Sequence, residues 1–397
     1  MHARIGWQNL RTSEFLDAGD YMLITGTDFE DGKVNFSTCH YVEKERYNQD
    51  KNIQIKNGSI LITKDGTLGK VAYVEGLSMP ATLNAGVFNV EIKDENEIDD
   101  RYLFQFLKAP FLMDYVAQKA TGGTIKHLNQ NILVDFPIST PSKAEQIKIG
   151  EYFSNLDHLI TLHQRKCDET KKLKKYMLQK MFPQNGHSVP EIRFSGFTED
   201  WEQRKLDDIA EFSKGSGYSK GDLTESGTPI ILYGRLYTKY ETIISDVDTY
   251  VEAKEGSVYS KGGEVIIPAS GETAEDIARA ATIDKSGILL GGDLNIVMPN
   301  EDINSAFLAI SISNGNSQLE LAKKAQGKSV VHIHNEEIRN LIVPFPTKTE
   351  QNKIVDYFSG LDHLITLHQY KPYLTKRTIK KLLTNIKAQK GEELWQN

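Results

Sequence analysis

The sequence predicts an α+β protein in which two mixed α/β domains lie in tandem and each is followed by a long helix. The main observation is a repeat, because residues 145–164 and 350–369 are identical at 16 of 20 positions and lie 205 residues apart (350 − 145). The chain of 397 residues is long enough for two or more domains, each with its own core. Two such similar helices are expected to pair antiparallel with pseudo-two-fold symmetry.

The repeated segments have the pattern of amphipathic helices. Each begins with a capping box, Ser142 with Glu145 in the first copy and Thr347 with Glu350 in the second. The first helix is expected to extend to about Phe182. Apolar side chains recur at steps of four, three and four residues, which places them on one helix face. The residues predicted to pair the helices are Ile149, Phe153, Leu156 and Ile160 in the first copy and Ile354, Phe358, Leu361 and Ile365 in the second.

The second helix contains a proline. Pro372 occupies the position that matches Cys167 in the first copy. Proline removes a backbone donor and clashes with the preceding turn, so we expect a kink or break near Tyr370–Tyr373. A separate helix over Lys376–Lys390 would then follow.

These features divide the chain into four parts. We expect a first domain at 1–140, a long helix at 141–186, a second domain at 187–345, and a second helix with a C-terminal tail at 346–397.

The first domain is predicted to contain short strands and one helix. Ile60–Thr63, Val71–Val74 and Gly86–Val90 have the composition of strands, and the first two flank the glycine-containing turn Lys64–Lys70. Asp100–Gln118 has apolar residues at helical spacing, which predicts one helix.

The second half repeats this plan. Gly263–Ile267 aligns with Gly58–Ile62 at the same offset of 205 residues, and His332 aligns with His127. Between such matched points the two domains share almost nothing. The duplication therefore covers whole domains, and a shared scaffold with unlike loops suits recognition of two different targets.

One segment has no counterpart. The second half begins with Val189–Leu206, whereas the first half starts about twenty residues later in the internal alignment. The sequence thus predicts that the chain is truncated or that its first domain lacks an opening segment.

Composition limits the functional classes. The net charge is −7, and the acidic excess lies in the domains, with 14 basic and 19 acidic residues in 1–140 and 15 and 25 in 191–345. Residues 141–190 and 346–397 each carry 9 basic and 5 acidic residues. Cys39 and Cys167 alone predict neither a disulfide framework nor a zinc site. Without a transmembrane run or signal peptide, we expect a cytoplasmic protein.

Catalytic motifs are weak. Ala322–Ser329 fits a loose phosphate-loop pattern but follows a helix instead of a strand, and Gly215–Gly217 lacks the rest of a dinucleotide fingerprint. The paired histidines at 158 and 163, and at 363 and 368, have a spacing that puts them on different helix faces. We therefore expect buried or interfacial histidines and no metal site.

The better candidates are loops that combine glycine with hydroxyl, basic and aromatic side chains. Glycine lets backbone amides approach phosphate, Lys, Ser and Thr supply donors, and Arg or Gln can recognise base edges. The same residues are also compatible with ordinary surface turns. The candidate DNA-binding residues are Thr25, Thr27, Lys64, Thr67, Lys70, Thr121, Gly122, Gly123, Thr124, Lys126, His127, Tyr233, Arg235, Tyr237, Lys239, Gln326, Gly327, Lys328, Ser329 and His332.

Four stretches together are typical of one family. They are Gly58–Gly66, Pro141–Gln146, Leu156–Gln164 with its twin from Leu361, and Phe197–Leu206. On these stretches the chain resembles the specificity subunit of type I restriction–modification systems (HsdS), and the resemblance covers nearly the whole sequence.

The resemblance implies a non-catalytic reader of double-stranded DNA. Each globular part would be a target recognition domain that reads one half of an asymmetric, bipartite site through the major groove. The two helices would form a spacer and dock two modification (methyltransferase) subunits, which restriction (translocase-nuclease) subunits would join. S-adenosylmethionine, ATP and Mg²⁺ would be used by these partners, with no cofactor, metal or membrane contact in this chain.

Two features depart from the family pattern. The domains are acidic, and the opening segment is missing from the first half. Two alternatives to DNA recognition therefore remain open: an inactive or truncated paralogue that serves only as a protein-interaction scaffold, and an enzyme that acts alone.

Overall fold

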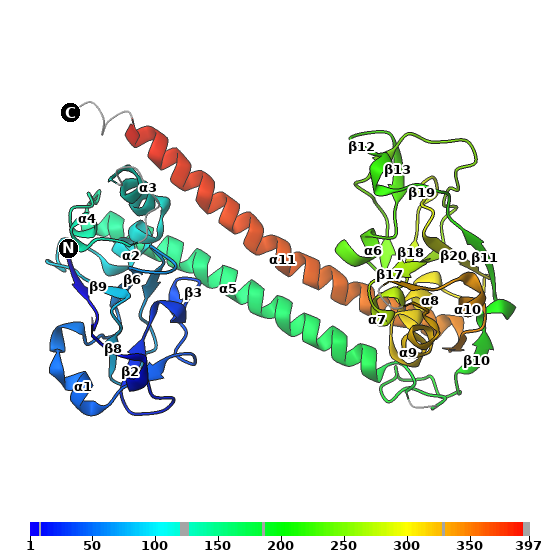
Figure 1. Cartoon of the computed structure of the whole chain (residues 1–397), viewed down its shortest axis with the longest axis horizontal. Helices are drawn as coiled ribbons and strands as arrows, with labels where there is room; N and C mark the ends of the chain where they lie inside the picture. The colour runs from blue at the N-terminus through cyan, green and yellow to red at the C-terminus, as the bar shows by residue number, and fades with distance from the viewer. Residues whose placement is uncertain (8, 120–126, 185–186, 328–329, 392–397) are drawn as a thin grey trace. The chain divides into compact units, whose positions relative to one another are not determined.

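The structure is a computed structural model that describes residues 1–7, 9–119, 127–184, 187–327 and 330–391 (Figure 1). It forms two compact units, the first comprising Met1–His163 with Lys371–Asn397 and the second comprising Gln164–Tyr370. Each unit therefore contains one domain, the nearer part of the helix that follows it, and part of the other long helix.

The described residues of the first unit form two sheets. The larger has the strand order β1-β9-β6-β7-β4-β3 and the smaller has the order β5-β2-β8. The strands are β1 (His2–Ile5), β2 (Met22–Ile24), β3 (Phe29–Glu30), β4 (Lys33–Val34), β5 (His40–Tyr41), β6 (Ile60–Thr63), β7 (Val71–Tyr73), β8 (Ala81–Leu83) and β9 (Val87–Glu91).

Strand β6 lies in the interior of this unit, and its four residues are all buried. Because side chains alternate across a strand, its neighbouring residues enter different cores. Ile60 and Ile62 pack in a cluster with Leu103 and Leu107 of a helix, whereas Leu61 packs in the cluster of the smaller sheet. The continuous apolar run thus belongs to a strand that is covered on both faces.

The helices of the first unit follow its sheets. They are α1 (Lys44–Gln49), α2 (Asp100–Lys108), α3 (Pro110–Lys119), α4 (Gln130–Val134) and the N-terminal part of α5 (Lys143–Lys180). The single helix expected over Asp100–Gln118 is wrong, because it is divided at Ala109, whose ψ of 160° is extended. The residue before a proline avoids helical geometry, and Pro110 follows directly.

Within its described part, the second unit has four sheets, with orders β11-β20-β16-β18-β14, β12-β15-β13-β19, β10-β22 and β17-β21. The strands are β10 (Glu202–Lys205), β11 (Ala210–Lys214), β12 (Leu223–Thr224), β13 (Thr228–Ile231), β14 (Ile243–Ile244), β15 (Tyr250–Val251), β16 (Glu264–Pro268), β17 (Ser270–Gly271), β18 (Ala281–Ile283), β19 (Leu289–Leu290), β20 (Leu294–Pro299), β21 (Val331–His332) and β22 (Ile342–Phe345). The helices are α6 (Arg235–Thr238), α7 (Ala274–Ile277), α8 (Ser305–Ile312), α9 (Gly315–Lys324), α10 (Asn335–Arg339) and α11 (Lys348–Gly391).

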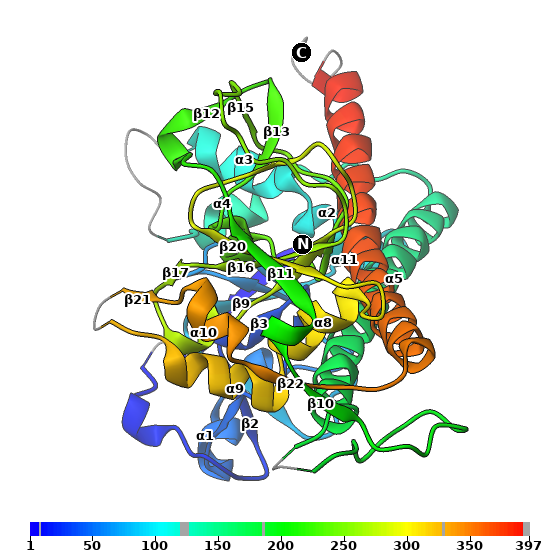
Figure 2. The ribbon, with the colours of Figure 1, turned by 90° about the vertical axis from the view of Figure 1, so that its right-hand side faces the viewer.

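The main strands of the two domains follow the same order, and Figure 2 shows β11, β20 and β16 of the second domain beside one another. The order β1-β9-β6-β7-β4 corresponds to β11-β20-β16-β18-β14, and in both series only the last pair is parallel. Similarly, β5-β2-β8 corresponds to β15-β13-β19, with one antiparallel and one parallel pair. Helices α3, α4 and α5 begin 205 residues before α9, α10 and α11 (315 − 110, 335 − 130 and 348 − 143). The duplication predicted from a few matched residues therefore extends to the topology of whole domains.

The segment without a counterpart forms part of the second domain. Its strand β10 pairs antiparallel with β22, and Trp201 just before it is 2% exposed in the main core. The residues that match β22 in the first unit, 137–140, form no strand with any part of the chain that the structure describes.

A buried glutamine attaches each long helix to its own domain. Gln146 Nε2 donates to the carbonyls of Pro141 and Glu97, and its Oε1 accepts from the Asp99 N–H, each at 2.9 Å. The matching Gln351 makes the same set of contacts with Pro346, Asp302 and Asn304 at 3.0, 3.4 and 2.8 Å. The repeated sequence thus includes both the helix and the glutamine that attaches it to its domain.

The two long helices run antiparallel within the second unit. Cys167 Sγ of α5 lies 3.9 Å from the Ile365 carbonyl of α11, and Lys174 Nζ lies 2.5 Å from Asp362 Oδ1. Residues later in α5 thus contact residues earlier in α11, as antiparallel helices do. Ile354, Phe358 and Leu361 are buried in the core of the second domain, where Met181 and Phe182 also lie. The repeated apolar face therefore serves the domain core as well as the helix pair.

In the first unit the matching face is less covered. Ile149, Phe153 and Ile160 line a groove whose other side includes Lys376 and Ile379 of α11. Ile160 is buried, whereas Ile149, Phe153 and Leu156 are half-buried. The predicted pairing residues thus have different environments in the two units despite their nearly identical sequences.

Pro372 does not break the second helix. Helix α11 continues from Lys348 through Pro372 to Gly391, so the expected break and separate helix are wrong. Pro372 is buried, and the preceding turns are held in the core by Ile354 and Phe358. Tertiary packing can outweigh the local helix propensity of one residue. Within the described ranges, no helix is both long and apolar enough to cross a membrane.

Replacing Gln146 by alanine should lower the free energy of unfolding by about 2–4 kcal/mol, since the three hydrogen bonds of this buried side chain are lost. Urea denaturation would measure the loss. Lys148→Ala, at an exposed position in the same helix turn, is the matched control and should change stability by less than about 0.5 kcal/mol. Equal effects of the two substitutions would contradict the role of Gln146.

Pro372→Ala should raise the free energy of unfolding by about 1–2 kcal/mol. Alanine restores an N–H donor and removes a ring clash worth about 3 kcal/mol, while the loss of buried ring carbons offsets part of that gain. A lower thermal midpoint for this variant would show that packing of the ring contributes more than the helix backbone.

Candidate nucleic-acid interface

In the first unit the candidate lysines lie on a constrained loop, residues 64–70, that directly follows β6. Its turn is closed by Thr63, whose Oγ1 accepts from the Lys70 N–H at 2.9 Å and donates to the Thr67 carbonyl. Gly66 and Gly69 have φ of 71° and 73°, a region that favours glycine. The loop is therefore held in one conformation with the side chains of Thr67 and Lys70 exposed.

A second predicted segment meets this loop. His127 Nδ1 lies 2.5 Å from Asp65 Oδ1, and the Leu128 N–H donates to the Lys64 carbonyl at 3.0 Å. Lys64 Nζ is itself 3.5 Å from Asp65 Oδ2. The structure thus brings Lys64 and His127 together through an acidic residue that the sequence reasoning did not select. The candidates Thr121, Gly122, Gly123, Thr124 and Lys126 lie outside the described residues.

The second unit places matching residues in the same relation. Ser270 and His332 occupy the positions of Asp65 and His127 at an offset of 205 (270 − 65 and 332 − 127), and Ser270 Oγ lies 3.2 Å from His332 Nδ1. Strands β17 and β21 join the two segments through Ser270 and His332. The common offset is the signal by which Asp65 and Ser270 could have been found from the sequence.

The loop before His332 is closed by its own backbone. Gln326 and His332 exchange two backbone hydrogen bonds at 3.1 and 2.8 Å. Gly327 has φ of 138°, and a Cβ atom there would lie 1.9 Å from the Val330 carbonyl oxygen. Only glycine fits this approach of two backbone segments. The candidates Lys328 and Ser329 lie outside the described residues.

The aromatic candidates of the second unit, Tyr233 and Tyr237, lie beside the Ser270 segment. Tyr237 donates its hydroxyl proton to the Ser270 carbonyl at 2.7 Å, and its ring meets that of Tyr233 edge-on at 6.2 Å. Burial of the hydroxyl raises the pKa of Tyr237 above its usual range, so it stays a proton donor. Tyr233 is 37% exposed and can present a ring face to a ligand.

Arg235 lies in an internal ion-pair network. Its guanidinium donates to Asp248 at 2.8 Å, to Glu241 at 2.7 Å and to the Asp246 carbonyl at 3.0 Å, and the residue is 9% exposed. Lys239 pairs with the other carboxylate oxygen of Asp248 at 3.0 Å and is exposed. The structure therefore gives Arg235 a structural environment, and base recognition by Arg235 stays a prediction.

The threonine candidates of the first unit also have local roles. The backbone N–H and Oγ1 of Thr25 both donate to the buried carboxylate of Asp28, at 2.8 and 2.9 Å. Thr27 is exposed beside them, with its Oγ1 2.7 Å from that of Thr25. Thr25 thus shapes the turn, and Thr27 is the more accessible of the two.

The repeated histidines differ from expectation. His158 and His363 are exposed on their helices, so the prediction that all four are buried or interfacial is wrong for these two. Among the residues that the structure describes, no cluster of histidine, cysteine and carboxylate side chains could hold a metal ion.

Comparison with known proteins relates this architecture to a protein family. A model of the type I restriction modification DNA specificity domain matches residues 6–172 and again residues 198–374, one match for each domain with its helix. The type I restriction enzyme MjaVIII specificity subunit of Methanocaldococcus jannaschii is 24% identical over 349 residues, 84% of this chain and 79% of that protein. The putative MjaX specificity subunit of the same organism is 22% identical over 89% of this chain and 83% of its own length.

Solved structures show the same fold. The type I restriction–modification S subunit from M. genitalium aligns with a TM-score of 0.58 and 15% identity over 96% of this chain and 91% of that chain. A chain from work on complex assembly and conformational transition of the type I system aligns with a TM-score of 0.52 and 15% identity over 96% of this chain and 97% of its own. With two tandem matches across most of its length, the chain belongs to the type I restriction–modification DNA specificity family, as a non-catalytic DNA-recognition subunit.

Proposed function

We propose that each unit reads one half of a bipartite, asymmetric site on double-stranded DNA. The observation that carries this is the matched pair of loops, Asp65 beside His127 and Ser270 beside His332, on two scaffolds of equal topology. Equal scaffolds would present the loops to DNA in equal ways, while unlike loop sequences would select different bases. Lys64, which pairs with Asp65, and Tyr233, whose ring meets that of Tyr237, would supply a donor and a ring face close to these pairs.

The same proposal assigns the long helices a spacing and docking role. Antiparallel helices would fix the separation of the two loop clusters, as a site of two half-sites with fixed spacing requires. Their exposed surface would dock two modification subunits, and restriction subunits would join that complex. S-adenosylmethionine, ATP and Mg²⁺ would then be bound by the partners.

The direct test is co-expression of this chain with modification (methyltransferase) subunits, followed by mapping of methylated adenines in host DNA. The expected result is one asymmetric motif of two short half-sites separated by a fixed spacer. Methylation that follows no bipartite motif would contradict the proposal. A chain that binds modification subunits but directs no methylation and has no DNA affinity would be the protein-interaction scaffold.

Lys64→Ala and Lys70→Ala should each weaken DNA binding by a similar factor for all sequences. If each lysine contacts one phosphate, the slope of log K against log salt should fall by about 1 for each substitution. Titrations of the assembled methyltransferase with specific and random duplexes at several salt concentrations would measure both effects. Lys51→Ala, an exposed lysine away from the loop, is the matched control and should leave the slope unchanged.

Arg235→Ala should lower the free energy of unfolding by about 1.5–3 kcal/mol, because its charged hydrogen bonds are lost and two carboxylates lose their shared partner. Lys239→Ala removes an exposed partner of the same Asp248 and should cost about 0–1 kcal/mol. Denaturant titrations of both variants would compare them. Unchanged stability of Arg235→Ala, together with relaxed selection at one base, would instead establish Arg235 as a reader.

A further inference from the structure

The two histidine pairs, His127 with Asp65 and His332 with Ser270, lie on the same backbone arrangement in both units. The Leu128 N–H donates to the Lys64 carbonyl at 3.0 Å, and the Ile333 N–H donates to the Ala269 carbonyl at 3.0 Å. These are the same hydrogen bond at an offset of 205 residues (333 − 128 and 269 − 64). Any difference between the two pairs therefore comes from their side chains.

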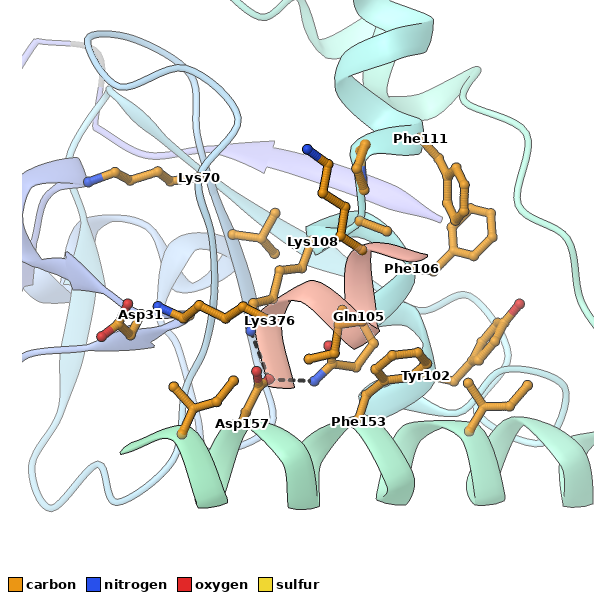
Figure 3. Close-up of a pocket in the computed structure, with 18 of the residues that line it drawn as sticks. Asp31, Lys70, Tyr102, Gln105, Phe106, Lys108, Phe111, Phe153, Asp157 and Lys376 are labelled. Carbon is orange, nitrogen blue, oxygen red and sulfur yellow. Dashed lines mark hydrogen bonds and ion pairs between the residues drawn. The ribbon is translucent and has the colours of Figure 1, made fainter. Parts of the chain in front are cut away.

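The side chains beside the histidines differ at two neighbouring positions. The first unit has Lys64 and Asp65 where the second unit has Ala269 and Ser270. Lys64 Nζ lies 3.5 Å from Asp65 Oδ2, so the carboxylate has a positive neighbour. Figure 3 shows Lys70, at the far end of the same loop, in the lining of the groove beside α5. Lys64 is thus the lysine of this loop that contacts Asp65, and the second unit has a hydroxyl beside a methyl group instead.

Asp65 determines which ring nitrogen of His127 carries a proton. A carboxylate accepts hydrogen bonds and donates none. His127 Nδ1 lies 2.5 Å from Asp65 Oδ1, so Nδ1 is the donor and the neutral ring has its lone pair on Nε2. The side chain of His127 is 66% exposed, which leaves Nε2 accessible to a ligand. The first unit thus presents a hydrogen-bond acceptor at this point.

Ser270 imposes no such choice on His332. Its Oγ lies 3.2 Å from His332 Nδ1, and a hydroxyl group can donate or accept. When Oγ donates, Nε2 carries the proton and is a donor, and when Oγ accepts, Nε2 is an acceptor. His332 is also exposed. The second unit can therefore present either polarity to a ligand.

The polarity of such a nitrogen matters at the edge of a base. In the major groove, adenine N6 and cytosine N4 are amino donors, whereas guanine O6 and thymine O4 are acceptors. An acceptor that the protein holds in place meets an amino group favourably and leaves two acceptors unpaired against guanine or thymine. A fixed tautomer is thereby converted into a preference between bases.

We propose that Asp65 fixes His127 as a hydrogen-bond acceptor that selects adenine or cytosine at one position of the first half-site. This inference rests on the DNA-reading function proposed above and assigns one contact within it. His127 is the residue that touches the base, and Asp65 is a positioning residue that acts through it. Ser270 does not impose the same restriction on His332.

The first test compares base selection by the methyltransferase assembled with the wild-type chain, Asp65→Ser or His127→Ala, in competition binding to duplexes varied at each half-site position. Both variants should lose about three- to tenfold of the preference for adenine or cytosine at one position, and keep the other half-site unchanged. Asp17→Ser, at an exposed position outside the loop, is the matched control and should change neither half-site. Unchanged selection in Asp65→Ser, or a wild-type preference for guanine at the position that His127→Ala affects, would overturn the inference.

Base analogues test the same contact with the wild-type chain. Purine in place of adenine, or pyrimidin-2-one in place of cytosine, lacks the amino group. At the selected position the analogue should weaken wild-type binding by about three- to tenfold and should not weaken binding by His127→Ala. Equal losses for the two chains would show that His127 does not contact the amino group and would overturn the inference.

The reciprocal variant uses the second unit. Ser270→Asp should restrict one position of the second half-site to adenine or cytosine, and unchanged selection would overturn the role of the carboxylate. Spectra of the full chain labelled with [15N]histidine should show the proton of His127 on Nδ1, and a proton on Nε2 alone would overturn the inference directly. A wild-type chain that selects no bipartite motif would overturn this inference together with the proposed function. A wild-type bipartite motif that none of these variants alters would overturn this inference alone.

Discussion

The architecture depends on one buried side chain in the first turn of each long helix. Gln146 and Gln351 attach their helices to the preceding domains through backbone groups on both sides of the helix start. A buried amide satisfied at both ends leaves little freedom of rotation, since any slip would leave polar groups unpaired. The helix phase is thereby fixed, and with it the direction in which the apolar face of each repeat points.

Buried strands in each domain determine where the candidate loops begin. Strands β6 and β16 are wholly buried, so the loops that follow them begin from rigid positions. Each of those loops meets a histidine of the following segment, through Asp65 in one unit and Ser270 in the other. The scaffold thus holds two loops together in both domains and leaves the chemistry between them free to differ.

The two halves also show how one sequence serves two environments. Ile354 and Phe358 are buried in a domain core, whereas the matching Ile149 and Phe153 are half-buried beside a groove. In the second unit Phe182, which follows α5, packs against Phe358 with the ring centroids 6.2 Å apart, in the core that also contains Ile354. Near-identical helices therefore have unequal burial, because different side chains pack against them.

Much of this organisation was determined by the sequence alone. The repeat at an offset of 205 predicts the duplicated domains, the antiparallel helices and the strand Ile60–Thr63, because periodicity and repetition are local properties of the chain. Local rules failed where distant packing dominates. Pro372 lies within a continuous helix held by the second core, and Arg235 is surrounded by carboxylates from residues 241 and 248. Only the tertiary structure decided the environments of Pro372 and Arg235, because these depend on side chains that are distant in sequence. The groove beside Glu145 became visible only in the tertiary structure for the same reason.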